Sequence, residues 1–360
     1  MRTILIHSAS GDDSSMFDPN ERDGYNDPAI YLRERFSELG YDFKAADNNS
    51  LEGCEWIFFN DVSSVLTYSG WRGMAKKTKS KIKNKLLVRN VYDECIQAGM
   101  KDRLALFLWE APAACPKNWD SKLHKMFPVI FTWHDTFVDG RKVFKICWPQ
   151  TRKFTEIPKI PFAKKKLLIN ISMNKFSHYP KELYSARRAA IRYFERNYSD
   201  DFDLYGVGWN RPMNLLEKVL PFTQQIYPSY RGTVKNKWDV MPYYRFSLCY
   251  ENVRDEPGYI TEKIFDSMRC GCVPIYWGAL NINDYVDAGA FIDRRRFKDD
   301  SELDKYLCGI TEHEYERFQK AIRSYLASPR FARFLPSAYA DTIIQALGLT
   351  AQDVKGIIKI

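Results

Sequence analysis

Apolar and polar positions alternate along the first half of the chain in blocks that predict strands followed by helices. Asp27 and Pro28 supply a cap and a first turn for a helix that Gly40 ends. A second helix is predicted over 84–98. Strands that alternate with helices favour a parallel sheet of the Rossmann type. The predicted strands span 3–7, 56–59, 104–108, 129–132 and 143–146.

The alternation resumes after a segment between Pro149 and Lys166 in which prolines interrupt polar and basic residues. Strands are predicted over 167–172 and 202–205, helices over 182–197 and roughly 301–325, and a last apolar segment over 336–358. The full length of 360 residues exceeds the usual size of one hydrophobic core. We therefore expect an α/β fold with an N-terminal domain over 1–155, a C-terminal domain over 156–330 and a helical tail over 331–360.

Residues 249–278 join a strand end, a polar loop, a short helix and a second strand. The strand over 246–250 runs into the loop, and Thr261 is placed to cap a helix that begins with Glu262 and Lys263. The first turn of a helix offers unpaired amides and the positive end of the helix dipole, which α/β folds use to bind diphosphates. This stretch therefore predicts a nucleotide-diphosphate site.

The same residues resemble the signature of the alpha-1,3/4-fucosyltransferases, glycosyltransferase family ten. The resemblance rests on Tyr250-Glu251-Asn252, on 259–263 and on 273–278, and it continues into 290–297. It implies the GT-B fold, two Rossmann-like domains facing a cleft, in which the last helix often returns to the N-terminal domain. It also implies GDP-fucose as the donor substrate.

Sugar transfer needs a base for the acceptor hydroxyl and cations for the leaving diphosphate. Glu110 directly follows the apolar residues 104–109, so its carboxylate is expected at the carboxyl edge of the sheet, facing the cleft. The resembled family places its proposed base in a similar Glu-x-Pro turn, here Glu110-Ala111-Pro112. Glu110 is the predicted catalytic base, and an exposed strand-end carboxylate is the alternative.

Lys263 is expected to reach a phosphate held by the helix amides. The resemblance implies a second cation, an arginine from the helix that follows the first strand of the second domain. Arg187 fits the apolar spacing after it better than Arg188 does, and both stay candidates. Extra residues over 175–184 loosen the register there.

Four further residues are predicted to bind the donor. Glu262 is expected to accept hydrogen bonds from ribose hydroxyls, and Tyr259 and Asn252 to line the ribose or sugar pocket. For Glu251, binding of fucose hydroxyls and capping of the strand both stay open.

The run Asp201-Phe202-Asp203 matches an Asp-x-Asp metal-binding pattern. It leads into Tyr205-Gly206, which is similar to a segment of the resembled family, and the five histidines show no metal-ligand spacing. We therefore predict no metal site and no cofactor besides the donor substrate.

The net charge of +9 favours an anionic partner, such as nucleic acid, an anionic membrane surface or a phosphorylated ligand. The lysine-rich run over 76–85 is either a solvated face or a contact for a membrane or acceptor. Eight cysteines without a CxxC pair fit a reducing compartment. The start MRTILIHSAS predicts a strand rather than a signal peptide, so we expect a cytoplasmic protein, with peripheral contact at the inner membrane left open.

Together these observations favour an inverting fucosyltransferase that acts on a glycan acceptor. The resemblance implies transfer to the 3-hydroxyl, sometimes the 4-hydroxyl, of N-acetylglucosamine in a lactosamine-type glycan. A GT-B transferase with another nucleotide sugar is the alternative enzyme. A basic protein that binds nucleic acid or a membrane surface is the alternative from another class. The helix-start motif argues against that class, and no nucleic-acid partner is expected.

Overall fold

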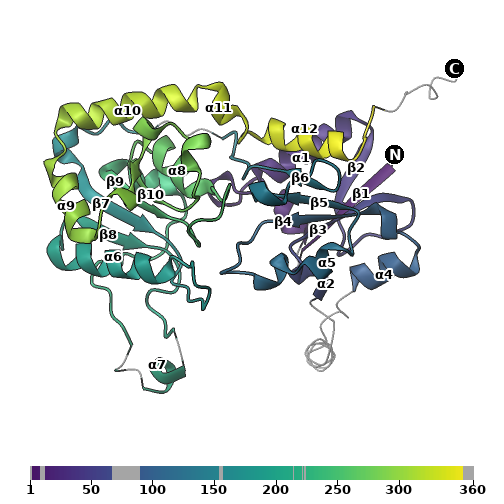
Figure 1. The fold of residues 1–360 in the computed structure, drawn as a ribbon, viewed down its shortest axis with the longest axis horizontal. Coiled ribbons are helices and arrows are strands. Elements are labelled where there is room, and N and C mark those ends of the chain that lie inside the picture. The colour runs from purple at the N-terminus through teal and green to yellow at the C-terminus, as the bar shows by residue number, and fades with distance from the viewer. Residues whose placement is uncertain are drawn as a thin grey trace. The chain divides into compact units, whose positions relative to one another are not determined.

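The computed structural model describes residues 2–8, 13–66, 90–153, 157–213, 215–220, 222 and 224–351. Contacts divide the chain into two compact units (Figure 1). Unit 1 comprises Met1–Arg152 with Phe334–Ile360, and unit 2 comprises Lys153–Arg333. The helical tail expected over 331–360 is grouped with the N-terminal residues in unit 1 from Phe334 onward. The lysine-rich run over 76–85 lies outside the described residues.

In the described residues, unit 1 is built on a six-stranded parallel sheet with the order β2-β1-β3-β4-β5-β6. Successive residues of its central strands face opposite sides of the sheet, so Leu104 and Leu106 pack into one apolar cluster and Ala105 and Phe107 into another. The strands are β1 (Arg2–Ser8), β2 (Tyr41–Ala45), β3 (Cys54–Asn60), β4 (Leu104–Leu108), β5 (Val129–Thr132) and β6 (Val143–Lys145).

Strand β2 was not predicted from the sequence. It spans five residues in which Asp42 and Lys44 alternate with buried Tyr41, Phe43 and Ala45. It lies at the edge of the sheet, where polar side chains are tolerated because only one side of the strand is paired. A segment this short and polar carries a weak apolar signal.

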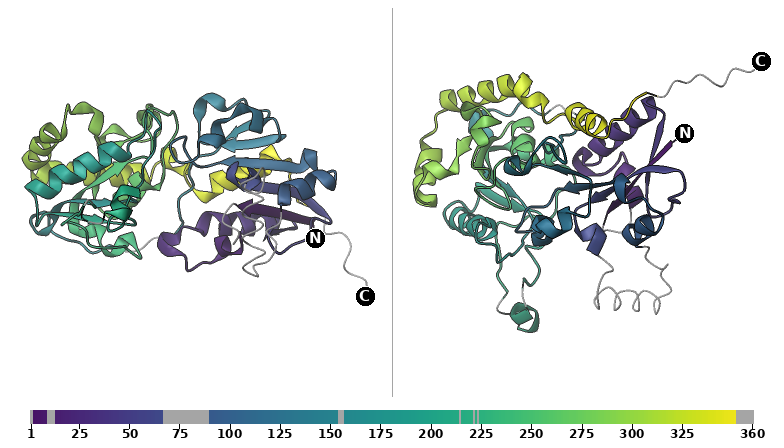
Figure 2. Two further views of the ribbon diagram at one scale, coloured as in Figure 1. Left: turned by 90° about the horizontal axis from the view of Figure 1, so that it is seen from below. Right: turned by 45° about the vertical axis from the view of Figure 1, so that its right-hand side comes forward.

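The helices of unit 1 pack on both sides of its sheet, and the last of them closes one apolar cluster. Helix α12 lies beside α1 in both orientations of Figure 2. Tyr339 and Ile343 of α12 share that cluster with Phe36 of α1 and Phe107 of β4. Of the helix predicted over 84–98, the structure describes 91–97 as helical. The helices are α1 (Asp27–Glu38), α2 (Ser63–Leu66), α4 (Val91–Gln97), α5 (Ser121–His124) and α12 (Pro336–Ala346).

Unit 2 contains a five-stranded parallel sheet in its described part, with the order β11-β10-β9-β7-β8. Figure 1 shows α10 along one side of this sheet and α6 along the other. The strands are β7 (Lys166–Ile171), β8 (Phe202–Tyr205), β9 (Tyr244–Tyr250), β10 (Val273–Trp277) and β11 (Ile292–Asp293). The helices are α6 (Tyr184–Asn197), α7 (Leu215–Val219), α8 (Glu262–Arg269), α9 (Asp300–Gly309), α10 (Glu312–Leu326) and α11 (Pro329–Ala332).

The helical region predicted over roughly 301–325 is confirmed and consists of two helices. Helix α9 ends at Gly309, and Thr311 begins α10 with a capping box in which its hydroxyl accepts from the Glu314 amide. The Glu314 carboxylate in turn accepts from the Thr311 amide at 2.9 Å. The reciprocal pair fixes the start of the second helix.

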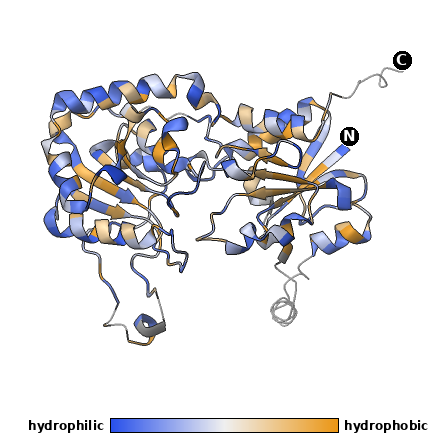
Figure 3. Ribbon diagram, viewed as in Figure 1, coloured by the Kyte–Doolittle hydropathy of each residue, from blue (hydrophilic) through white to orange (hydrophobic). Residues whose placement is uncertain are grey.

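In both sheets the strand order reverses beside the first strand of the unit, between β1 and β3 and between β7 and β9. Ligands of open α/β sheets bind at the carboxyl ends of the strands near such a reversal. Figure 3 shows the strands as mostly hydrophobic and the helices as mixed, as expected for sheets covered by helices. Within the described ranges, no helix combines the length and apolar character needed to cross a membrane.

Candidate active site

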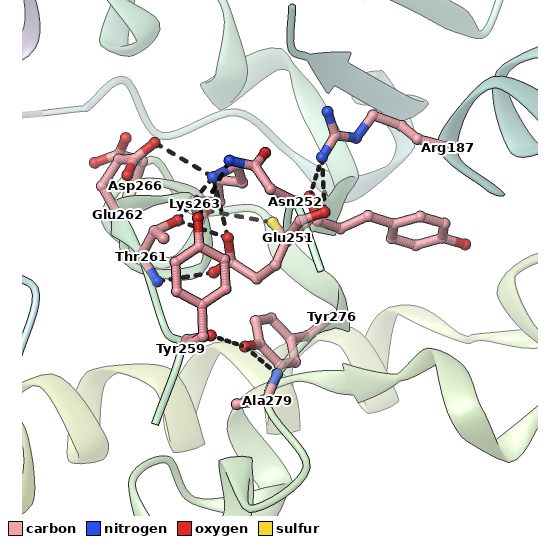
Figure 4. Close-up of polar contacts among 12 residues, drawn as sticks. Arg187, Glu251, Asn252, Tyr259, Thr261, Glu262, Lys263, Asp266, Tyr276 and Ala279 are labelled. Carbon is pink, nitrogen blue, oxygen red and sulfur yellow. Dashed lines mark hydrogen bonds and ion pairs between the residues drawn. The ribbon is translucent and has the colours of Figure 1, made fainter. Parts of the chain in front are cut away.

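Arg187 of α6 binds the end of β9, one of the two strands beside the strand reversal of unit 2 (Figure 4). Its Nη2 donates to the carbonyl oxygens of Tyr250 at 2.6 Å and Glu251 at 2.9 Å. The side chain is 3% exposed. Burial lowers the pKa of Arg187, although Tyr184 and Glu251 favour its charged form. Arg187 therefore holds the end of β9, from which the loop to α8 begins.

Arg188, the other predicted cation, has a different partner. Its Nη1 donates to the carbonyl oxygen of Lys175 at 2.6 Å, in the segment between β7 and α6. Its side chain is half-buried, whereas Arg187 is buried. The two arginines thus bind different parts of the backbone. Which of them binds the diphosphate stays a prediction.

Glu251 is the centre of the hydrogen-bond network at the start of α8 (Figure 4). It is fully buried. Its Oε1 accepts from the Thr261 amide at 2.8 Å, and its Oε2 accepts from the Thr261 hydroxyl at 2.8 Å and from Lys263 Nζ at 3.0 Å. Both carboxylate oxygens are thus engaged within the protein. Glu251 ties the end of β9 to the beginning of α8, and a role in binding fucose stays a prediction.

Thr261 occupies the N-cap position of α8 as predicted, but its side chain does not cap the helix. Its hydroxyl makes no capping hydrogen bond to the helix as described. Instead the hydroxyl donates to Glu251 and accepts from Lys263 Nζ at 2.8 Å. A cap would need the hydroxyl oxygen to accept from a helix amide, but this oxygen accepts from Lys263 Nζ while the hydroxyl proton is donated to Glu251. The first turn of α8 is therefore left without a cap from Thr261.

Lys263 and Glu262 present opposite charges at the start of α8, with side chains 22% and 33% exposed. Burial alone would lower the pKa of Lys263, but Glu251 and Glu262 outweigh it and raise this pKa. Burial alone would raise the pKa of Glu262, but Lys263 and Lys237 outweigh it and lower this pKa to about 2. Both groups are therefore charged at neutral pH, and a partly exposed cation stands at a helix start.

Asn252 and Tyr259 contact each other within the same loop. Asn252 Nδ2 donates to the Tyr259 hydroxyl at 3.2 Å, and Tyr259 is 1% exposed. The Tyr276 hydroxyl donates to the Tyr259 carbonyl at 3.2 Å, which fixes the loop from the side of β10. Gly278 stands against this group, because a Cβ there would lie 2.5 Å from Glu251 Cγ and from the Tyr276 hydroxyl oxygen. The position directly after β10 thus has space only for glycine.

In unit 1, Glu110 follows β4 as predicted, and its main chain is held from both sides. Its amide donates to Asp61 Oδ1 at 3.1 Å. Its carbonyl accepts from Asn118 Nδ2 at 3.2 Å and from Trp119 Nε1 at 3.3 Å. The half-exposed side chain makes no hydrogen bond from its carboxylate to a residue that the structure describes. The described residues thus fix the main chain of Glu110 and leave its carboxylate unengaged, and its role as the catalytic base stays a prediction.

Asp61 and Asn118 were not predicted from the sequence. Asp61 directly follows β3, which pairs with β4 so that Asn60 faces Phe107. Polar residues that follow neighbouring parallel strands lie at the same sheet edge. This rule could have placed Asp61 near Glu110. Asn118 lies in a short 3-10 helix (Pro116–Trp119) to which this rule does not apply.

The Asp-x-Asp run has another role in this structure. The Asp203 carboxylate accepts from Lys166 Nζ at 2.7 Å, from Arg231 Nε at 2.6 Å and from the Tyr244 hydroxyl at 2.6 Å. Among the residues described, no three histidine, cysteine, aspartate or glutamate side chains gather as a metal site would require. Asp203 is an internal ion-pair partner within unit 2, and the cofactor prediction stays a prediction.

Two solved structures show which class of fold this is. A crystal structure of an alpha1,3-fucosyltransferase with GDP-fucose aligns with a TM-score of 0.50 and 13% identity, over 99% of this chain and 91% of that one. Anabaena Alr3699/HepE in complex with UDP-glucose aligns with a TM-score of 0.53 and 12% identity, over 97% and 99%. Such a likeness shows the fold alone, and it confirms the prediction of a GT-B glycosyltransferase fold with two parallel-sheet domains.

Part of unit 2 matches a family model, and short stretches of the chain match curated relatives. Residues 177–330 match the model of the C-terminal part of glycosyltransferase family 10 (fucosyltransferase). An alpha-(1,3)-fucosyltransferase of Helicobacter pylori is 35% identical over 81 residues, which is 22% of this chain and 17% of that protein. An alpha-(1,4)-fucosyltransferase of Arabidopsis thaliana is 42% identical over 67 residues, 19% and 16% of the two chains. Unit 2 is thus similar to the C-terminal part of family 10 fucosyltransferases, and the chain spans less than a fifth of the length of these relatives.

Proposed function

We propose that the protein transfers L-fucose from GDP-β-L-fucose to a hydroxyl of a glycan acceptor. The observation that carries this proposal is the Glu251–Thr261–Lys263 network at the start of α8, inside the family 10 domain. It offers a partly exposed cation and a first helix turn that the Thr261 side chain does not cap, features that favour binding of a diphosphate. The named activities of the two fucosyltransferase relatives support fucose as the sugar.

Unit 2 would bind the donor. Amides of the first turn of α8 and Lys263 Nζ would hold the diphosphate, and Glu262 would accept hydrogen bonds from ribose hydroxyls. Negative charge grows on the diphosphate as the bond to fucose breaks, so a fixed cation stabilises the transition state more than the ground state. Glu251 would keep Lys263 charged and in place. Arg187 would support the same loop. We propose that Lys263 and Arg187 balance the negative charge of the departing diphosphate without a metal.

Glu110 would remove the proton from the acceptor hydroxyl. The oxygen would attack the anomeric carbon on the face opposite GDP, so that the β-linked donor gives an α-fucoside by inversion. We propose O3 of N-acetylglucosamine in a lactosamine-type glycan as the acceptor atom. Relatives with an alpha-(1,4)-fucosyltransferase name and with the name GDP-fucose protein O-fucosyltransferase 3, the latter from Xenopus laevis, make O4 and protein hydroxyls the alternatives to test.

The direct test incubates the protein with GDP-fucose and N-acetyllactosamine, with and without EDTA, and follows GDP release and product mass. We expect a product heavier by one fucose in both conditions. A protein that releases no GDP and forms no product with this acceptor, with a type 1 lactosamine or with a glycoprotein overturns the proposed activity. Product that vanishes in EDTA overturns the metal-free step.

A second measurement separates the base from the donor site. Glu110→Gln should abolish turnover and leave the affinity for GDP within about twofold, because only the proton acceptor is lost. Loss of GDP binding would mean that Glu110 belongs to the donor site. A thermal-shift panel of GDP, UDP and CDP tests the alternative donors, because the correct nucleotide stabilises the folded protein.

A further inference from the structure

Asp61 binds the turn that carries Glu110 through a single carboxylate oxygen. Asp61 Oδ1 accepts from the amides of Trp109 at 2.8 Å and Glu110 at 3.1 Å, and also from Asn118 Nδ2. Its own amide donates to the Phe107 carbonyl at 2.8 Å. Asp61, the residue directly after β3, thus binds the main chain at the end of β4, where the pairing between the two strands ends.

Asn118 completes this connection from a third segment. It is fully buried. Its Oδ1 accepts from the Val62 amide at 2.9 Å, and its Nδ2 donates to Asp61 and to the Glu110 carbonyl at 3.2 Å. Asp61 and Asn118 therefore hold both the amide and the carbonyl of Glu110.

The arrangement is costly for the fold. Asp61 has φ of 59°, in the left-handed region that residues with a Cβ seldom adopt. Burial raises the pKa of Asp61 to about 6, and the negative charge of Glu110 adds to the rise against the effect of the bound amides. Strained backbone and desolvated charge persist where the surrounding structure imposes them, and they cluster at functional sites.

We propose that Asp61, locked by Asn118, is a positioning residue that fixes the turn after β4 and thereby the place from which Glu110 takes the acceptor proton. The inference rests on the proposed function, because it takes Glu110 as the base. Glu110 is better placed than Asp61 to bind an acceptor hydroxyl, because Oδ1 of Asp61 already accepts three hydrogen bonds whereas the Glu110 carboxylate accepts none from the described residues.

The test compares Asp61→Asn, Asp61→Ala and Asp61→Gly, with kcat and KM measured for donor and acceptor. Asn keeps an acceptor oxygen and should retain most of the activity. Ala and Gly remove the acceptor and should lower kcat by roughly ten- to a hundredfold, the size expected when a catalytic group is misplaced by about 1 Å. KM for GDP-fucose should stay within about twofold, because the donor site lies in unit 2. Gly adopts a positive φ without strain, so this variant serves if the Ala variant fails to fold.

Asp139 provides a matched control. Its Oδ1 accepts from three main-chain amides, those of Arg141, Lys142 and Val143, each at 2.8 Å, and none of them belongs to Glu110. Asp139→Ala therefore removes an equivalent set of hydrogen bonds from unit 1, and we expect wild-type kcat. An equal loss of kcat in this control would show that loosening unit 1 anywhere is sufficient, and would overturn the positioning role.

The remaining outcomes separate this inference from the proposed function. A folded Asp61→Gly protein with wild-type kcat overturns the positioning role while fucosyl transfer stands. Asp61→Asn as inactive as Glu110→Gln shows that Asp61 itself exchanges the proton, which also overturns it. If Glu110→Gln keeps full turnover, the base assignment is wrong and the positioning role falls with it. A wild-type protein without transfer activity refutes the proposed function itself.

Discussion

Lys263 Nζ lies 3.0 Å from Oε2 of Glu251, a carboxylate with no exposed surface. The Thr261 amide and hydroxyl complete the hydrogen bonding of that carboxylate. Removing one partner of a buried ion pair leaves an uncompensated charge, which destabilises far more than the intact pair stabilises. Glu251 therefore decides both the stability of the α8 start and the position of Lys263.

Glu251→Ala should lower the free energy of unfolding by about 3–5 kcal/mol. Urea denaturation followed by circular dichroism measures this loss. Glu55→Ala is the matched control, because Glu55 pairs with Arg2 at 3.1 Å on the surface, with side chains 25% and 58% exposed. We expect that control to cost less than about 1 kcal/mol. Equal losses in the two variants would contradict the central role of Glu251.

Replacement of Arg187 and replacement of Arg188 should have different effects on the free energy of unfolding and on GDP affinity. Arg187→Ala leaves the carbonyls of Tyr250 and Glu251 without their buried donor, which we expect to cost about 1–3 kcal/mol each. GDP affinity, measured by calorimetry, should fall at least about tenfold because the loop before α8 shifts. Arg188→Ala removes a half-buried contact to Lys175 and should leave both quantities closer to wild type. A selective loss of GDP affinity in the Arg188 variant would reverse the assignment.

Features that are continuous in the sequence could be predicted, and features that depend on strand register could not. Strand β4 was predicted with its correct limits because Leu104–Leu108 is an unbroken apolar run, buried throughout. The position of Glu110 followed from the end of that run. Its partner Asp61 lies 49 residues earlier, and the two meet only because β3 pairs with β4 in one particular register.

The failed cap at Thr261 has a similar cause. The residues around Thr261 match the pattern of a helix start, and the helix does begin there. The hydroxyl nevertheless turns to Glu251, ten residues earlier at the end of another element. Local sequence predicts a cap because it contains no information about a buried carboxylate that the fold brings alongside.

Asp61 should make the stability of unit 1 fall as pH rises. Its pKa is about 6 in the folded protein and 3.8 for an unperturbed aspartate. The folded state therefore binds more protons than the unfolded state between these values, so its stability decreases through this window as pH increases. At about 1.4 kcal/mol per pH unit, the ionised Asp61 costs up to about 3 kcal/mol at pH 7. Asp61→Asn should remove this dependence and gain stability relative to wild type at pH 7 but not at pH 4.

Asp139 should behave in the opposite sense in the same experiment. Three main-chain amides hold its carboxylate and lower its pKa to about 2. Its contribution is present above the unperturbed value of 3.8 and is lost as pH falls toward 2. Asp139→Asn should therefore destabilise at pH 7 and approach wild type in acid. Thermal unfolding between pH 3 and pH 8 checks both signs, and a parallel response of the two variants would contradict the environment assigned to Asp61.

Helix α12 should contribute to the stability of unit 1, because Ile343 is fully buried in the cluster that contains Phe36 and Phe107. Ile343→Ala should cost about 2–4 kcal/mol, measured by urea denaturation. Ile344 is the matched control, since the neighbouring residue packs only partly buried against the same cluster, and Ile344→Ala should cost less than half as much. GDP affinity should be unchanged in both variants, because the donor-binding residues lie in unit 2. If Ile343→Ala unfolds no more easily than Ile344→Ala, residues 336–346 do not close the core of unit 1, and the apolar cluster must be covered by other residues.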